Sequence, residues 1–140
     1  MPSGKAKARP DGRQVLRAYF AECGWDVVDA GDSGLSWAYG GASGTWFGQA
    51  WWLPEPEQLL VYAVCADPVP FRARARLAKF VAGVNAELVI GSFELDGQLR
   101  FRVGVPVGAA ELSPDLVRRT VETAVATVEL HRPAIAELLG

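Results

Sequence analysis

The sequence has 140 residues, of which 50% are hydrophobic, and its formal net charge is −2 at pH 7. This length fits one domain, and a chain of this size buries enough surface to form a core without disulfides or metals. The small net charge excludes a general attraction to nucleic acid or to a membrane surface, and no apolar run reaches the ~20 residues that a membrane span needs. Two cysteines, Cys23 and Cys65, are too few for a disulfide framework and indicate free thiols in a reducing cytoplasm. We therefore expect a cytoplasmic protein without a membrane segment or a secretory signal.

The N-terminal half predicts one helix followed by strands. Residues 1–10 are small, polar and basic, and we expect a disordered tail ahead of a single domain that spans residues 11–140. Asp11 is a suitable N-cap, and Cys23-Gly24 is a suitable end, so the first helix is expected at about 11–23. β-rich runs separated by turn residues then predict strands near 25–29, 34–39, 44–53 and 58–66, the first of which is either a strand or an extended lead-in.

The C-terminal half predicts a helix, a hairpin and a second helix. Helical spacing returns after Pro70, and Gly83 and Asn85 indicate the end of that helix. Ser113-Pro114-Asp115 is a strong helix start, and Pro133 is expected to kink or interrupt the long last helix near residues 129–132. The expected order is therefore a helix, three or four strands, a helix, two strands and a last helix. This order favours an α+β fold with helices packed on an antiparallel sheet.

The stretch from Val84 to Val103 reads as two strands joined by Asp96-Gly97, which is a strong hairpin signal. With a two-residue loop, Gly91 lies opposite Arg102. The face away from the core then carries Gly91, Phe93, Arg100 and Arg102. This face is too apolar for solvent, as is the second face of the strand at 58–66. We expect one of the helices, a second subunit or a client protein to cover it.

Gly91 stands in the middle of an otherwise good strand, where glycine costs roughly 0.5–1 kcal/mol relative to alanine. A bulge, a close approach by another backbone, or room for an arginine stem would each explain it. We expect Gly91 and Ser92 to bend the strand and to shape a concave surface for a partner. On this interpretation, Gly91→Val weakens association more than it lowers stability.

The same stretch resembles the YbjN family, whose pattern is an asparagine, a run like that from Ile90 to Asp96, and a basic-aromatic strand like Arg100–Arg102. Gly24-Trp25, the run LLVYAVCADPVP and Leu112-Ser113 agree in order, so the resemblance covers roughly residues 12–140. The tryptophan-rich run TWFGQAWW departs from the family pattern. The resemblance implies a fold similar to type III secretion chaperones, with three helices against an antiparallel sheet, usually in homodimers. It also implies a protein-binding or regulatory role without catalysis.

No set of residues predicts an enzyme. His131 is the only histidine and has no cysteine at metal-ligand spacing, so we expect a helix-end side chain. Glu94 and Asp96 flank a tight turn, and turn chemistry explains them better than catalysis does. The glycine-rich runs lack the lysine of a phosphate loop and are expected to be hairpin loops. We therefore expect no catalytic residue, metal, cofactor or small-molecule substrate.

Exposed aromatic and basic side chains indicate binding instead. Some rings of the tryptophan group are expected in the core. Adjacent Trp51 and Trp52 must point to opposite faces of a strand, so one of them must leave the core or be covered by a partner. The group consists of Trp37, Trp46, Trp51 and Trp52. The candidate partner-binding residues are Trp51, Trp52, Phe93, Arg100, Arg102 and Gly91. Our first interpretation is a homodimeric adaptor or chaperone-like protein that binds an unidentified client protein.

The alternative function is association with nucleic acid. It would use a basic helix face, aided by Lys5, Lys7 and Arg9 in the tail. The helix-face residues are Arg72, Arg74, Arg76 and Lys79. The acidic pI of about 5.4 favours a solvated face, so direct binding of nucleic acid is the weaker interpretation.

Overall fold

The computed structural model describes residues 11–29, 31, 34–41, 44–107 and 112–140, so the predicted tail at 1–10 lies outside the described residues. The elements are α1 (Gly12–Glu22), β1 (Val28–Asp29), β2 (Gly34–Gly41), β3 (Gly44–Pro54), β4 (Glu57–Cys65), a 3₁₀ turn η1 (Phe71–Ala73), α2 (Arg74–Glu87), β5 (Ser92–Leu95), β6 (Leu99–Pro106) and α3 (Pro114–Leu139). This order confirms the predicted α+β fold.

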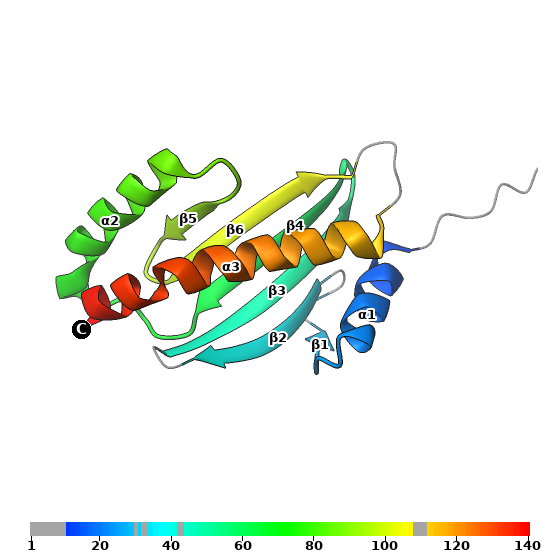
Figure 1. The fold of residues 1–140 in the computed structure, drawn as a ribbon, viewed down its shortest axis with the longest axis horizontal. Helices are drawn as coiled ribbons and strands as arrows, with labels where there is room; N and C mark the ends of the chain where they lie inside the picture. Colours follow the sequence, from blue (N-terminus) through cyan, green and yellow to red (C-terminus); the bar gives the residue numbers. More distant parts are fainter. Residues whose placement is uncertain (1–10, 30, 32–33, 42–43, 108–111) are drawn as a thin grey trace, which may run out of the picture.

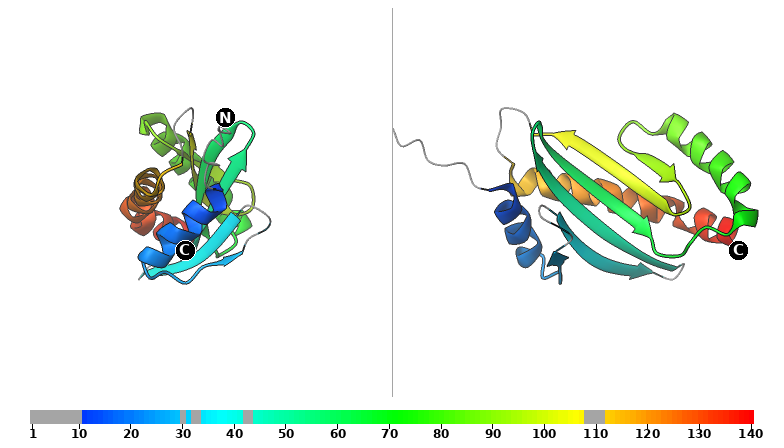
Figure 2. Two further views of the ribbon diagram at one scale, coloured as in Figure 1. Left: turned by 90° about the vertical axis from the view of Figure 1, so that its right-hand side faces the viewer. Right: turned by 180° about the vertical axis from the view of Figure 1, so that it is seen from behind.

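The six strands form one antiparallel sheet in the order β1-β2-β3-β4-β6-β5 (Figure 1). The long helix α3 crosses one face of the sheet, which we call the inner face, with α1 beside it and α2 near the β5 edge. Seen from behind, the strands lie in front of α3 and no described helix crosses them (Figure 2). We call this second face the outer face.

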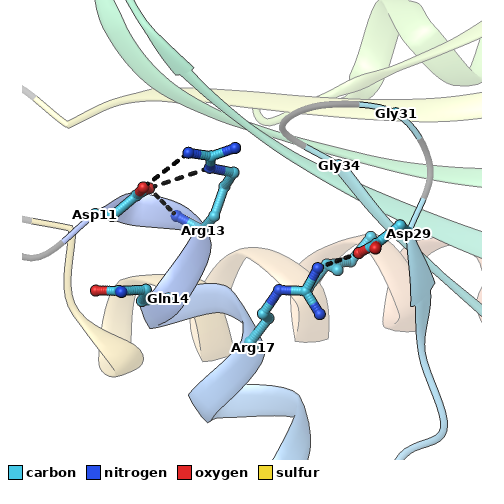
Figure 3. Close-up of a pocket in the computed structure, with 8 residues that line it drawn as sticks. Asp11, Arg13, Gln14, Arg17, Asp29, Gly31 and Gly34 are labelled. Atoms are coloured by element: carbon cyan, nitrogen blue, oxygen red, sulfur yellow. Dashed lines mark hydrogen bonds and ion pairs between the residues drawn. The ribbon is translucent and has the colours of Figure 1, made fainter.

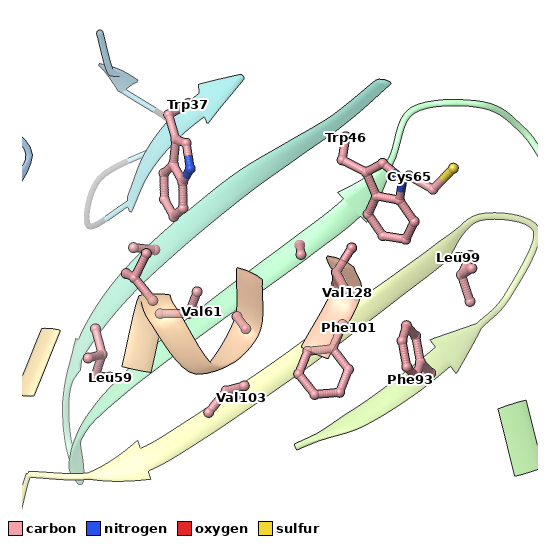
Figure 4. Close-up of a cluster of buried hydrophobic side chains, with 14 of the residues drawn as sticks. Trp37, Trp46, Leu59, Val61, Cys65, Phe93, Leu99, Phe101, Val103 and Val128 are labelled. Carbon is pink, nitrogen blue, oxygen red and sulfur yellow. The ribbon is translucent and has the colours of Figure 1, made fainter. Parts of the chain in front are cut away.

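The core lies between the inner face and α3 (Figure 4). Trp46 from β3 is 1% exposed, and Phe101 from β6 is fully buried. Val121, Ala124 and Val128 of α3 are buried in the same cluster, because residues three or four apart share one face of a helix. Burying side chains of this size contributes about 1.5–3 kcal/mol each, so this cluster holds helix and sheet together.

Helix α1 begins and ends as its sequence predicts. The Asp11 carboxylate accepts a hydrogen bond from the Arg13 N–H at 2.9 Å, as an N-cap does. Gly24 has a φ of +71°, the left-handed conformation that commonly follows a helix.

Two helix ends differ from the expectation. Helix α2 continues through Gly83 and Asn85 to Glu87, and Leu88 is the first residue with an extended conformation. Helix α3 continues through Pro133 to Leu139, so of the two expected effects of the proline, a kink or an interruption, the interruption does not occur. Ile135, beyond the proline, is 1% exposed, and its burial stabilises the last turns against the loss of one backbone hydrogen bond.

The hairpin register is also corrected. Leu95 pairs with Leu99, so the loop has three residues, Asp96, Gly97 and Gln98. Gly97 has a φ of +97°, and its carbonyl accepts a hydrogen bond from the Val69 N–H at 3.2 Å. Three-residue hairpin loops commonly place one residue in this left-handed region. The shift by one residue moves every β5 side chain to the opposite face from the one predicted.

Gly91 consequently lies just before β5 rather than inside a strand. Its φ is +80°, and a Cβ atom there would stand 2.5 Å from the Phe101 ring and 2.8 Å from the Arg102 carbonyl oxygen. Of the three explanations from the sequence, close approach by another backbone is therefore the one that the structure supports.

Candidate partner-binding face

A groove of about 400 Å³ lies on the outer face across β3, β4 and the start of β6. The register places Trp51 beside Leu60, Gln49 beside Tyr62, and Phe47 beside Val64, and paired residues share one face. The residues that line the groove are Phe47, Gln49, Trp51, Leu53, Leu60, Tyr62, Val64, Gln98 and Arg100. The floor is therefore aromatic and aliphatic, and one end carries polar donors.

Trp51 and Trp52 point to opposite faces, as predicted. Trp51 packs on the outer face against the backbone of Gly34, where a Cβ atom would stand 2.6 Å from the ring. Trp52 packs on the inner face against Gly12 of α1, and its Nε1 donates to a Glu57 carboxylate oxygen at 3.0 Å. Only Trp51 of the pair is therefore available to a partner on the outer face.

Arg100 closes one end of the groove and is held in place by two carboxylates. Its Nε donates to Glu94 at 2.8 Å, and its Nη2 donates to Asp96 at 2.8 Å. These hydrogen bonds raise the pKa of the Arg100 guanidinium above its usual range. Arg102 lies on the same face and has a longer ion pair with Glu94, at 4.0 Å. The prediction that both arginines lie away from the core is confirmed.

Three of the predicted partner-binding residues lie elsewhere. Phe93 is 3% exposed on the inner face, where its ring centroid is 4.8 Å from that of Phe101, so its predicted place beside the arginines is wrong. Trp52 is also on the inner face, and Gly91 contacts Phe101. The structure therefore brings together only Trp51 and Arg100 in the groove, with Arg102 on the same face.

Sequence reasoning missed most of the groove. Phe47, Leu53 and Gln49 alternate with the inward residues of β3, and this alternation was visible in the sequence. Their meeting with Leu60 and Tyr62 depends on the β3–β4 register, which no single strand reveals. Arg132 was missed as well: it is 4% exposed on α3 and pairs with Glu129.

The four helix-face residues of the nucleic-acid alternative are exposed, and Lys5, Lys7 and Arg9 lie outside the described residues. Arg72 lies in η1, whereas Arg74, Arg76 and Lys79 lie on α2. Arg74 stacks over the Phe71 ring at 5.7 Å, and the Arg76 guanidinium donates to the Leu138 carbonyl at 3.0 Å. Two of the four cations are therefore engaged in contacts within the chain.

A second hollow, of about 420 Å³, lies between α1 and the β1–β2 connection (Figure 3). Arg13 pairs with Asp11, and Arg17 pairs with Asp29. The pairing with Arg13 holds the pKa of Asp11 below its usual range. Because each basic group faces an acidic one, the charges balance and the hollow does not select an anion.

His131 lies within α3 rather than at its end. Its Nδ1 is 2.9 Å from the Thr127 carbonyl oxygen, and its ring meets Phe80 and Phe93 edge-on. Within the described ranges, no three His, Cys, Asp or Glu side chains gather closely enough to hold a metal ion. No helix in these same ranges has the length and hydropathy of a membrane span.

Comparisons with known proteins agree with this geometry. A model of the YbjN family, described as "Putative bacterial sensory transduction regulator", matches residues 12–137. The fold is similar to that of a solved structure described as "Crystal structure of YbjN, a putative transcription regulator from E. coli". The TM-score is 0.61 and the sequence identity is 12%, and the match covers 90% of this chain and 87% of that one. It is also similar to "Structure of the HopA1-SchA Chaperone-Effector Complex", with a TM-score of 0.58 and 13% identity over 86% of this chain and 91% of that one.

These two likenesses confirm the type III secretion chaperone fold that the sequence resemblance implied. A search of curated proteins finds no match. These likenesses give the nucleic-acid alternative no support.

Proposed function

Because the chain belongs to the YbjN family, we propose that it is a non-catalytic protein-binding module that holds a client protein on the outer face of its sheet. The apolar groove on that face is the observation that carries the proposal. Antiparallel sheets that face water usually present polar side chains there, and this one presents Phe47, Trp51 and Tyr62. Large apolar patches of this kind mark sites of protein interaction.

The client is expected to insert apolar side chains between Trp51 and Tyr62. Aromatic residues are enriched among the side chains that dominate binding energy, and each buried ring contributes roughly 1.5–3 kcal/mol. Gln98 at one end of the groove supplies an amide group that can orient a polar part of the client. One of the similar structures is described as a chaperone bound to its effector, which supports a protein rather than a small molecule as the ligand.

We further propose that the module acts as a homodimer in the cytoplasm. Exposed apolar side chains outside the groove, such as Phe71 at 85% and Val89 at 97%, offer surface for a second copy. The free thiols of Cys23 and Cys65 suit a reducing compartment. A mass near twice 15.0 kDa by light scattering across micromolar concentrations is expected, and a mass near 15.0 kDa throughout would contradict the dimer.

Client binding is tested by capture from an extract of the native host with three forms of the tagged protein. Leu60→Lys places a charge in the groove, and Leu130→Lys places one on the exposed side of α3, where Leu130 is 76% exposed. Proteins that co-purify with the wild type and with Leu130→Lys should be at least tenfold depleted with Leu60→Lys. Equal recovery with both variants would exclude the outer groove as the client site. Circular dichroism establishes that both variants are folded.

A further inference from the structure

Strand β6 is only partly covered at its edge. On one side it pairs with β4 from Arg100 to Pro106, but on the other side it pairs with β5 only from Leu99 to Arg102. Gly91, with its φ of +80°, turns the chain away just before β5 begins. No described strand therefore pairs with the β6 edge beyond Arg102.

The backbone groups on this edge can be assigned by alternation. The Val107 N–H donates to the Glu57 carbonyl on the β4 side, so the odd-numbered residues of β6 face β4. Even-numbered residues then face the other edge, and the Arg102 carbonyl oxygen, which lies close to Gly91, agrees with this assignment. The Gly104 N–H and C=O and the Pro106 C=O consequently point outward, and the described part of the chain supplies no backbone partner for them.

An apolar groove of about 450 Å³ lies directly beside this edge, between β6 and α3. Val103 and Val105 form its sheet side, Leu116 belongs to its helix side, and Ile90, which is 53% exposed, lies at the end where the chain turns into β5. A strand added to the edge would point every second side chain into this groove.

We propose that the β6 edge beyond β5 binds an extended segment of a client protein with the pattern apolar-acidic-apolar. The two apolar side chains lie opposite Val103 and Val105 and enter the groove. The acidic side chain between them lies opposite Gly104 on the outer face, diagonal to Arg102. Leu60 packs over Gly104, where a Cβ atom would stand 2.9 Å from its Cδ2, so the acidic side chain extends towards Arg102 rather than over Gly104.

Charge complementarity selects the acidic residue. Arg100 is bound by two carboxylates at 2.8 Å, whereas the carboxylate contact of Arg102 is a single one at 4.0 Å, and the Arg102 side chain is 45% exposed. A carboxylate on the client would therefore give Arg102 a closer partner. A second copy of β6 fits less well. Two antiparallel β6 strands centred on Gly104 would pair Pro106 of one copy with Arg102 of the other, and β5 already pairs with Arg102 on that edge.

This inference rests on the proposed protein-binding function but concerns a different surface from the outer groove. The test uses the full chain, labelled with ¹⁵N, and two synthetic peptides, Lys-Thr-Val-Glu-Val-Thr-Lys and its Glu→Lys counterpart. The glutamate peptide should shift the Gly104 amide resonance and slow its hydrogen exchange. It should bind about two- to fivefold more tightly than the lysine peptide, as an exposed ion pair predicts.

The variant Arg102→Glu should reverse this preference, while Arg72→Glu, on the exposed turn η1 and outside this groove, should leave it in place. Binding that shifts Trp51 and Tyr62 instead of Gly104 would overturn the inference and leave the proposed function standing. The inference would also be overturned if neither peptide bound, or if Arg102→Glu left the preference for the glutamate peptide unchanged. It would be overturned as well if slow exchange of the Gly104 amide depended only on the protein concentration. The last of these would assign the edge to a second copy.

Discussion

At the scale of single residues, Asn85 joins the end of α2 to the first strand of the hairpin. Its side-chain amide donates to the Phe93 carbonyl at 2.9 Å and accepts from the Phe93 N–H at 2.8 Å. The side chain thus replaces a neighbouring strand for one residue of β5. This pair of hydrogen bonds gives a structural reason for the asparagine in the family pattern.

Replacing Asn85 should destabilise the fold. Asn85→Ala leaves two partly buried backbone groups without a partner, and we expect a loss of about 1–3 kcal/mol in the free energy of unfolding. Asn85→Asp keeps the acceptor but sets a carboxylate against the Phe93 carbonyl, so its stability should improve when acid protonates the new side chain. Urea unfolding at neutral and acidic pH measures both effects, and a neutral Asn85→Ala variant would refute this role.

Substitution by alanine should have opposite effects on stability at Gly91 and at Gly83. Gly91→Ala must adopt a left-handed conformation and meet the Phe101 ring, so we expect a loss of about 2 kcal/mol or more. Gly83→Ala, in a helix with open space around it, should instead gain about 0.5–1 kcal/mol. Equal stabilities of the two variants in denaturant titrations would contradict this account. The effect on stability replaces the earlier expectation that Gly91→Val acts mainly on association.

Tyr19 predicts a loss of stability in alkali. Burial, followed by a hydrogen bond with Cys23, raises the pKa of Tyr19 from 10.0 to about 12. The neutral phenol therefore stabilises the fold fully below pH 10, and this contribution, about 2 kcal/mol, is lost as the pH rises towards 12. Burial raises the pKa of the Cys65 thiol in the same direction. The difference in the free energy of unfolding between the wild type and Tyr19→Phe should shrink between pH 9 and pH 11.5. A difference that stays constant over this range would contradict the role given to the Tyr19 phenol.

At the scale of elements, α3 carries a proline in its interior. Pro133 is exposed, so its ring adds little packing, and it removes the N–H that would bond the Glu129 carbonyl. Pro133→Ala should restore that hydrogen bond and raise the free energy of unfolding by about 1–3 kcal/mol. Thermal unfolding gives the comparison, and a lower melting temperature would show that the proline stabilises the helix by another route.

At the scale of the whole molecule, local signals determined the elements, and long-range contacts determined what they form together. Asp11 and Gly24 are sufficient to place α1 because capping is a local interaction. The hairpin loop was predicted one residue too short, because Gln98 belongs to it. The contacts that favour the longer loop include a hydrogen bond from the Val69 N–H to the Gly97 carbonyl, and Val69 lies 28 residues before Gly97. Adjacent tryptophans revealed that one ring faces outward, but only the pairing of β3 with β4 assembles the groove.

The central claim is that the outer face of the sheet contacts another protein in the cell. A photo-crosslinking amino acid in place of Tyr62, in the groove, tests it most directly, with Leu130 on the exposed side of α3 as the control position. After irradiation of the native host, substitution at Tyr62 should give covalent adducts heavier than the 15.0 kDa chain, and substitution at Leu130 should not. Adducts at Tyr62 no more abundant than those at Leu130 would contradict the account.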